Sequence, residues 1–327
     1  MTTQTVLDWS GRQLAALPES LGEQHDTTLT GVQGVHPRVS ELEELNLDNN
    51  RLEALPASLG RLEKLKKLSL YLNRLAELPE TLWNLTRLEI LNLGDNRFSQ
   101  LPEGIGRLVE LHMLDLGHNQ LSSLPSSIGN LSRLKFLYLS NNHLADLPET
   151  YARLTDLLYL NVTDNQLPSL PAWIGSLTGL IELRLYNNQI ASLPESIGRL
   201  AKLKELHLMH NRLVALPKTI GSLSGLRKLG LQGNQLTALP DTIGGLTCLT
   251  DLDLRDNHLA ELPEALGHLP NLRTLDLRAN RLRELPDSLA KLSKLEKLDL
   301  RWNRLDASGM PGWIAQLEAQ GCVVFTD

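Results

Sequence analysis

Leucines recur along this chain at a fixed spacing, and the whole pattern repeats every 23 residues. Residues 42–64 read LEELNLDNNRLEALPASLGRLEK, and residues 65–87 read LKKLSLYLNRLAELPETLWNLTR. The phase holds without an insertion through residue 294, which gives eleven consecutive repeats, and a partial repeat precedes them. A twelfth repeat begins at Leu295 and leaves the phase after Leu305. A fixed period of this length indicates a stack of similar structural units.

Within one repeat the hydrophobic period changes, as the third repeat shows. Leu91 and Leu93 alternate with outward residues, which predicts a short strand with one buried face. Ile105 and Leu108 return to the core three residues apart, which predicts a short helical or 3₁₀ turn. Pro102 lies between these segments and suits a position outside any ladder, because it has no N–H. One such coil cannot bury its own leucines, so stacked coils must share a continuous core.

An asparagine occupies the ninth position of every repeat. The series is Asn50, Asn73, Asn96, Asn119, Asn142, Asn165, Asn188, Asn211, Asn234, Asn257, Asn280 and Asn303. We interpret these amides as buried caps for the backbone of a bent loop rather than as a ligand ladder, because buried backbone groups need partners. The partial first repeat has Arg12 at this position, which is typical of an N-terminal capping coil with one face in solvent.

The consensus LxxLxLxxNxLxxLPxxLGxLxx resembles the leucine-rich repeat. Its LP dipeptide and 23-residue period are most similar to the intracellular Ras-group repeat proteins of plants and animals and to their bacterial relatives. The resemblance implies an α/β fold, a right-handed leucine-rich repeat β/α solenoid (horseshoe) with a parallel sheet on its concave face. We expect one structural domain, with an N-terminal capping coil plus insertion loop (1–41), the repeats (42–305) and a C-terminal cap (306–327). The cap should hold a short helix within 312–320 and a final strand within 322–325.

Composition and charge exclude several classes of function. A net charge of −6 and a pI near 5.9 disfavour a nucleic-acid binder and a polybasic membrane anchor. The sequence shows no signal peptide and no run of 18 apolar residues, so we expect a cytoplasmic protein without a membrane span. Cys248 and Cys322 are too few for a disulfide framework or a four-cysteine zinc site. Phosphate-loop, kinase and nucleophile motifs are missing as well, so we expect no enzyme activity and no cofactor.

Two histidines raise the question of a metal site. His207 and His210 lie three residues apart, but the segment runs from a strand into a turn, so the rings should not share a face. We find no cysteine or carboxylate close by in the sequence that completes a ligand set. We therefore expect no bound metal.

The candidate binding residues occupy the outward strand positions, which are the third, fifth, seventh and eighth of each repeat. Large side chains, and others common at interfaces, gather at these positions in consecutive repeats. They are Tyr71, Ile90, Met113, Phe136, Tyr138, Tyr159, Arg184, Tyr186, His207 and Met209. The seventh-position residues beside the apolar members of this set are small. Exposed apolar patches tend to mark interfaces, and Tyr, Met and Arg are enriched in interface cores. The alternative is ordinary strand propensity, which should act on all repeats alike. We therefore favour a shallow docking trough on the concave face.

The last repeats carry a different pattern, which we call the secondary polar face. It comprises Arg255, Arg278, Arg301 and Trp302, with Asp253, Asp276 and Asp299 two residues before the three arginines. Each Asp should pair with a nearby Arg. Two interpretations are open: a solvated charge ladder, or a clamp for a charged partner. We favour the ladder, because surface ion pairs contribute little to stability. The indole of Trp302 is a candidate anchor for a partner.

Three aromatic residues depart from the repeat on the outer side of the coils: Trp83 replaces the usual Gly, Trp173 stands where neighbours carry Ser, Thr or Gly, and Tyr151-Ala152 replaces Ile-Gly. Single exposed apolar residues are common on proteins, so we favour local repacking over a second contact site.

The sequence thus predicts a non-catalytic, monomeric scaffold that binds another protein on its concave face. The family resemblance implies intracellular signalling, with a small GTPase or a kinase as partner. A bacterial effector that acts in a host cell through the same face is the alternative. An enzyme such as a ligase is disfavoured, since the repeats and caps leave no segment for a catalytic domain.

Overall fold

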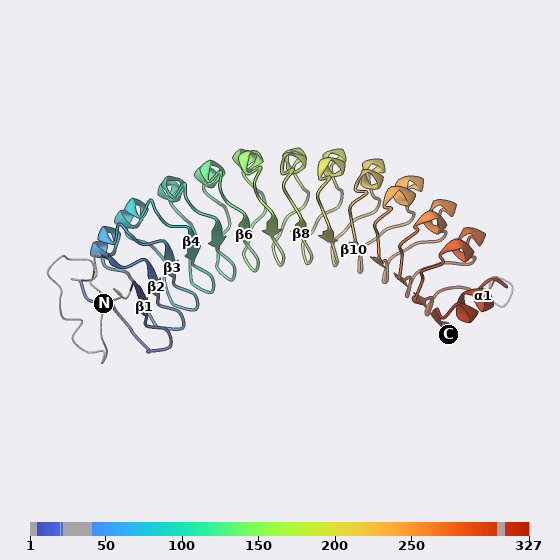
Figure 1. Cartoon of the computed structure of the whole chain (residues 1–327), viewed down its shortest axis with the longest axis horizontal. Coiled ribbons are helices and arrows are strands. Elements are labelled where there is room, and N and C mark those ends of the chain that lie inside the picture. The colour runs from blue at the N-terminus through green and yellow to red at the C-terminus, as the bar shows by residue number, and fades with distance from the viewer. Residues whose placement is uncertain (1–4, 20, 22–40, 306–310, 327) are drawn as a thin grey trace. The chain divides into compact units, whose positions relative to one another are not determined.

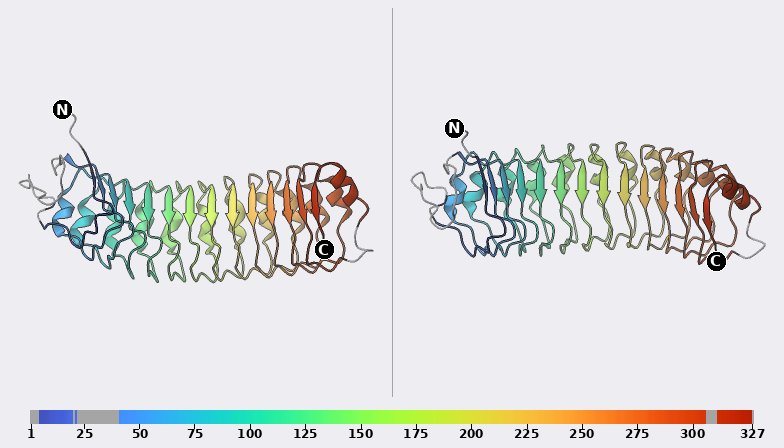
Figure 2. Two further views of the ribbon diagram at one scale, coloured as in Figure 1. Left: turned by 90° about the horizontal axis from the view of Figure 1, so that it is seen from below. Right: turned by 60° about the horizontal axis from the view of Figure 1, so that its bottom comes forward.

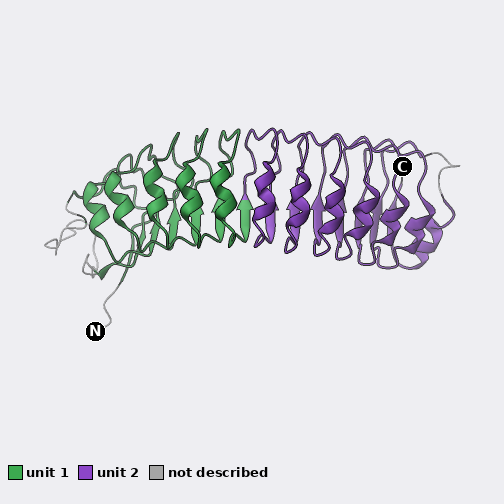
Figure 3. Ribbon diagram, turned by 90° about the horizontal axis from the view of Figure 1, so that it is seen from above, with its two compact units in different colours: residues 1–160 green, residues 161–327 purple. Residues whose placement is uncertain are grey.

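The computed structural model describes residues 5–19, 21, 41–305 and 311–326. It divides into two compact units, unit 1 (Met1–Leu160) and unit 2 (Asn161–Asp327), which Figure 3 colours separately. The predicted insertion at 23–37 lies outside the described residues.

Each repeat contributes one strand of three residues. Unit 1 holds β1 (Val6–Asp8), β2 (Glu44–Asn46), β3 (Lys67–Ser69), β4 (Ile90–Asn92), β5 (Met113–Asp115) and β6 (Phe136–Tyr138). Strand β7 (Tyr159–Asn161) lies at the boundary between the units. Unit 2 holds β8 (Glu182–Arg184), β9 (Glu205–His207), β10 (Lys228–Gly230), β11 (Asp251–Asp253), β12 (Thr274–Asp276), β13 (Lys297–Asp299) and β14 (Val323–Phe325). Within each unit, neighbouring strands pair in parallel and in chain order (Figure 2).

Short 3₁₀ helices occupy the side of each unit opposite the strands (Figure 1). Unit 1 has η2 (Ala57–Arg61), η3 (Glu80–Asn84), η4 (Glu103–Arg107), η5 (Ser126–Asn130) and η6 (Glu149–Arg153). Unit 2 has η7 (Ala172–Ser176), η8 (Glu195–Arg199), η9 (Lys218–Ser222), η10 (Asp241–Gly245), η11 (Glu264–His268) and η12 (Asp287–Lys291). A proline precedes each of these helices, as Pro102 does with φ −78° before η4. The proline of the LP dipeptide therefore starts the return segment, where its missing N–H is no loss.

The core of each unit is built from the repeated leucines. In the third repeat, Leu91, Leu93, Ile105 and Leu108 are completely buried, so the predicted strand and 3₁₀ turn are confirmed. At the C-terminal end, helix α1 (Ile314–Ala319) and β14 confirm the predicted helix and final strand. The leucine-rich repeat solenoid expected from the sequence is therefore present in both units.

The asparagine series is structural, as expected. In Asn119 the amide Nδ2 donates to the carbonyls of Leu93 at 3.0 Å and Leu116 at 3.1 Å, and Oδ1 accepts from the N–H of Phe98 at 3.0 Å. One amide thus bonds its own turn and the preceding coil. In the first coil, the backbone N–H of Arg12 donates to Asn50 Oδ1 at 3.1 Å, so the array of amides ends there.

Close approach of the 3₁₀ helices depends on glycine. A Cβ placed on Gly106 would lie 2.7 Å from the carbonyl oxygen of Ser127, and one on Gly267 would lie 2.2 Å from that of Ser288. Backbone atoms of the next coil can give way only if the whole coil shifts. The glycine that follows the buried Ile or Leu of these helices therefore sets how closely neighbouring coils pack.

Gly267→Ala is expected to lower the free energy of unfolding by about 1–2 kcal/mol, because the new methyl group overlaps the backbone of η12. The control is Gly312→Ala, since a Cβ at Gly312 meets no atom within 4 Å in the described part of the chain. Urea unfolding of both variants measures the difference. Equal midpoints would contradict glycine-limited packing between η11 and η12.

The large outer residues confirm local repacking at two of the three positions. Trp83 is completely buried, and a Cβ on Gly104 would lie 2.4 Å from its Cδ1, so this glycine makes room for the indole. Tyr151 is also buried, and its hydroxyl donates to the carbonyl of Pro125 at 3.3 Å. Trp173 is half-buried. Trp83 and Tyr151 are therefore core residues of unit 1.

Candidate functional site

Unit 1 carries a row of large side chains on its strand face, which is the face of the sheet that points away from the 3₁₀ helices. We define the apolar patch as Ile90, Met113, Phe136, Tyr138 and Tyr159. Met113 lies directly opposite Ile90 on one side and Phe136 on the other. The rings of Tyr138 and Tyr159 are 5.0 Å apart and tilted by 41°. Phe136 is 38% exposed and the other four are half-buried, so the patch is continuous and accessible.

Small residues and one carboxylate lie beside the apolar patch. Gly94 and Gly117 are buried at the seventh position, as the sequence predicts for a shallow floor. Asp115 lies opposite Tyr138 and accepts the N–H of Gly117 at 2.9 Å. Burial raises the pKa of Asp115 above its ordinary value. This half-buried carboxyl offers an acceptor at the edge of the patch.

Tyr71 has an exposed neighbour that the sequence reasoning missed. Tyr71 and Leu72 are both 39% exposed, and Leu72 has φ +57°. Most eighth-position residues are polar, so a bulky apolar residue in this left-handed conformation is unusual. Comparison of the eighth position across repeats is the signal that identifies Leu72.

The other predicted trough residues belong to unit 2. Arg184, Tyr186, His207 and Met209 are all half-buried. Because the predicted trough includes residues of both units, its assignment as one site stays a prediction.

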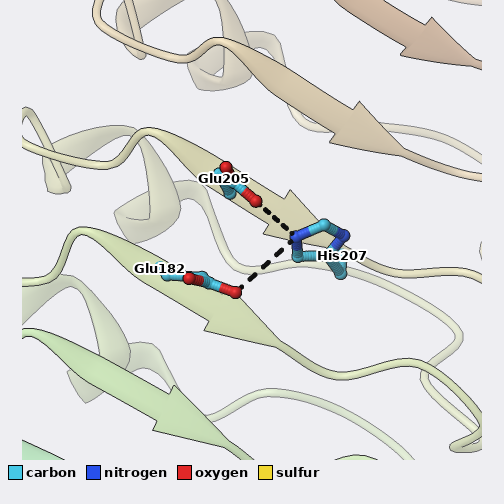
Figure 4. A group of neighbouring side chains, drawn as sticks. All are labelled: Glu182, Glu205 and His207. Atoms are coloured by element: carbon cyan, nitrogen blue, oxygen red, sulfur yellow. Dashed lines mark hydrogen bonds and ion pairs between the residues drawn. The ribbon is translucent and has the colours of Figure 1, made fainter.

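His207 has two carboxylate neighbours in the structure. Its Nε2 lies 3.1 Å from Glu205 Oε2 and 3.9 Å from Glu182 Oε1 (Figure 4). The expectation that no carboxylate close to this histidine completes a ligand set is wrong. Glu205 lies two residues before it on β9, and stacking brings Glu182, which is 25 positions earlier in the sequence, next to it from β8.

The cluster of Glu182, Glu205 and His207 offers three ligand atoms within 4.8 Å of one another, a geometry that a divalent cation can use. Cations of the chain already occupy it, because Arg184 pairs with Glu182 and Lys228 Nζ lies 3.0 Å from Glu205. Burial alone would raise the pKa of Glu205, but hydrogen bonds from Lys228 and His207 hold it below its ordinary value. The cluster therefore functions as an ion-pair network, and the absence of a metal stays a prediction.

The secondary polar face contains the predicted Asp–Arg pairs. Arg255 lies 3.0 Å from Asp253, Arg278 lies 2.6 Å from Asp276, and Arg301 lies 2.6 Å from Asp299. A solvated ladder is the wrong description of its end, however. The Asp276 side chain is 10% exposed and that of Asp299 is completely buried. The register places Phe325 of β14 opposite Asp299, so the cap strand covers the last pair.

Aromatic residues gather beside these pairs at the C-terminal end. Trp302 is 62% exposed and has φ +61°. The guanidinium of Arg301 lies 5.6 Å from its ring centroid and 5.0 Å from that of Phe325. Phe325, which is 37% exposed, was not among the predicted site residues because it lies outside the repeat. The exposed indole makes Trp302 accessible to a partner, as expected.

The two cysteine thiols are the remaining candidate nucleophiles of the sequence analysis. Cys248 is exposed, and burial raises the pKa of the Cys322 thiol, which disfavours the reactive thiolate. None of the helices in the described ranges is long and apolar enough to cross a bilayer.

Comparison with protein families identifies the repeats directly. The family described as "Leucine-rich repeat region" matches residues 81–163, 103–189 and 174–255. The family "Leucine rich repeat" matches residues 40–98 and 263–305. None of the curated proteins compared with the chain matches it significantly.

Solved structures show the same architecture. A leucine-rich repeat protein of Leptospira interrogans is 34% identical with a TM-score of 0.84, over 95% of this chain and 81% of that one. The plant peptide hormone receptor RGFR1, in complex with RGF2, is 30% identical with a TM-score of 0.76, over 91% of this chain and 51% of the receptor. This chain therefore spans about half of the receptor. An internalin of Listeria monocytogenes is 26% identical with a TM-score of 0.73, over 82% of this chain and 75% of that one. With these matches, the chain belongs to the leucine-rich repeat family.

Proposed function

We propose that this protein is a non-catalytic interaction scaffold that binds a partner protein through the apolar patch of unit 1. The observation that carries the proposal is the continuous row of five large, accessible side chains on adjacent strands. Accessible apolar clusters of this kind mark interfaces, and aromatic residues and Met are enriched in interface cores. Strand propensity is a weaker explanation, because the third position in unit 2 carries residues such as Glu205, Lys228 and Asp251.

The structural relatives support protein binding as the role of this fold. The plant peptide hormone receptor RGFR1, which resembles this chain, is in complex with RGF2. A leucine-rich repeat fold supplies a broad sheet surface whose outward residues vary without cost to the core. By extension, we assign a protein partner to this chain.

The cellular setting is part of the same proposal. The Ras-group form of the repeat supports a monomeric cytoplasmic protein in signalling, with a small GTPase or a kinase as the class of partner. A bacterial effector that acts in a host cell is the second candidate. The 34% identity with the protein of Leptospira interrogans supports this candidate. Both candidates use the same binding face.

A triple variant with Phe136, Tyr138 and Tyr159 changed to Ser tests the proposal. We expect it to fold and to recover at least tenfold less partner than the wild type in affinity purification with quantitative mass spectrometry, because the interface core is lost. Calorimetric titration with the recovered partner then measures the loss of affinity.

The control carries Lys202, Lys218 and Asp241 changed to Ser, three exposed residues outside the strands of unit 2. It should recover the same amount of partner as the wild type. Circular dichroism and thermal melting establish that all three proteins are folded. Recovery of the same proteins in equal amounts by the patch variant and the wild type would refute the assignment of the site.

A further inference from the structure

The strand face of unit 2 has a hollow of about 280 Å³ above strand β10. Gly230 ends this strand, and its register partners are His207 on β9 and Asp253 on β11. Both partners have side chains where Gly230 has none. The thioether of Met209 occupies the space that a side chain at Gly230 would take, and the hollow lies beside it over β10 and β11. A volume just below the usual range for small-molecule pockets, about 300–1,000 Å³, suits a single side chain.

One wall of the hollow is apolar. A Cβ on Gly230 would lie 2.4 Å from the Sδ of Met209, so the thioether of Met209 lies against the backbone of β10. The lining also includes Leu229 and Leu252. The side chains of Leu229 and Leu252 are buried in the core, so the apolar contact for an aliphatic chain comes from the flexible Met209, which can adjust to it.

The opposite wall is acidic. Asp251, Asp253 and Asp276 all line the hollow. Asp251 accepts a hydrogen bond from Thr250 Oγ1 at 2.7 Å, and none of the ion pairs in the described residues includes it.

The chain's own cations balance part of this acidity: Asp276 pairs with Arg278 at 2.6 Å, and Lys228, the register partner of Asp251, also lines the hollow. Asp251 is the carboxylate of this wall that no ion pair in the described residues includes. Lys228 Nζ is held by Glu205 at 3.0 Å, on the side of β9. Asp253 pairs with Arg255 at 3.0 Å. Even so, burial raises the pKa of Asp253, and the Asp276 carboxylate adds to the rise. An additional positive charge at this wall would relieve both effects.

We propose that the hollow above Gly230 receives one long cationic side chain, lysine or arginine, from the bound partner. The aliphatic part of that side chain lies along Met209, and its charged head lies between Asp251 and Asp253. The inference rests on the proposed function, because it assigns a second, charge-specific contact to the same protein-binding role.

A random dodecapeptide library on phage, selected against the immobilised full chain, tests the proposal. We expect the selected peptides to share a basic residue, and replacement of that residue by norleucine to weaken binding at least tenfold. Two variants test the hollow itself. Gly230→Leu narrows it, because the new side chain takes the space of the Met209 thioether, and Asp251→Asn removes the carboxylate that has no ion pair in the described residues. Each variant should lower the affinity of the protein for the selected peptides at least tenfold. Asp241→Asn, at an exposed carboxylate of η10, should leave that affinity unchanged.

The outcomes separate this inference from the proposed function. Peptides that bind Gly230→Leu and Asp251→Asn as tightly as the wild type, but lose affinity for the patch variant, would refute the hollow and leave the patch standing. Peptides that lose affinity for the two hollow variants alone support the hollow and refute the patch as their site. A library that yields no binding peptide counts against both.

Discussion

Asp299→Asn is expected to lower the free energy of unfolding by about 3 kcal/mol, because it removes the charge from a completely buried carboxylate. Asp299 Oδ2 lies 2.6 Å from Arg301 and 3.3 Å from Arg278, so both guanidinium groups lose a counter-charge. The expected loss is at the lower end of the usual range for buried pairs, since the side chain of Arg301 remains 34% exposed to water.

The matched control is Asp253→Asn, which removes the same charge from the equivalent position two repeats earlier. The Asp253 side chain is 30% exposed and pairs with a single arginine, so its loss should cost less than about 1 kcal/mol. Urea unfolding at neutral pH compares the two variants. Equal losses would mean that the cap strand β14 does not bury the last pair.

The same carboxylate should make this end of unit 2 sensitive to acid. Burial alone would raise the pKa of Asp299, but hydrogen bonds from Arg301 and the charge of Arg278 hold it below its ordinary value. A pKa that folding lowers contributes stability above the unfolded value, near 4, and that stability is lost as the pH falls through the folded value. The difference in stability between the wild type and Asp299→Asn should therefore shrink below about pH 4.

The sequence predicts the fold well because every level of the repeat agrees. Leu91 and Leu93 set the strand, Pro102 starts the return segment, and Asn96 bonds the bend, where its amide donates to the carbonyl of Leu93 at 3.1 Å. The same choices recur in each repeat, so a single local reading applies along the whole array. Even the departures could be interpreted, since Trp83 has Gly104 opposite it in the next coil.

The sequence predicts the site less completely, because contacts on the strand face join residues one repeat apart. Glu182 and His207 are 25 positions apart, yet their side chains approach within 3.9 Å. The columns of the aligned repeats hold the signal for this cluster, because Glu182 and Glu205 share the third position of adjacent repeats and His207 has the fifth. The burial of Asp299 could not be found in that way, because the covering residue Phe325 comes from the cap, which does not follow the repeat.

Constant and variable positions have separate physical roles in this molecule. Leucine and asparagine positions determine the coil, whereas the outward positions of neighbouring strands can change without disturbing it. Function is therefore best sought where an outward column departs from its neighbours. The apolar patch, the hollow at Gly230 and the exposed Trp302 are three such departures, and each involves outward positions that the core does not use.

Asn119→Ala is expected to lower the free energy of unfolding by about 2–3 kcal/mol, because the buried N–H of Phe98 loses its partner. The carbonyls of Leu93 and Leu116 should contribute less, since each also accepts from a second asparagine, Asn96 and Asn142 respectively. The control is Gln120→Ala, the next residue, whose side chain is exposed and should cost less than about 0.5 kcal/mol. Urea unfolding compares the two, and hydrogen exchange at the Phe98 amide should accelerate only in Asn119→Ala. Equal losses of stability in both variants would show that the asparagine series does not hold adjacent coils together.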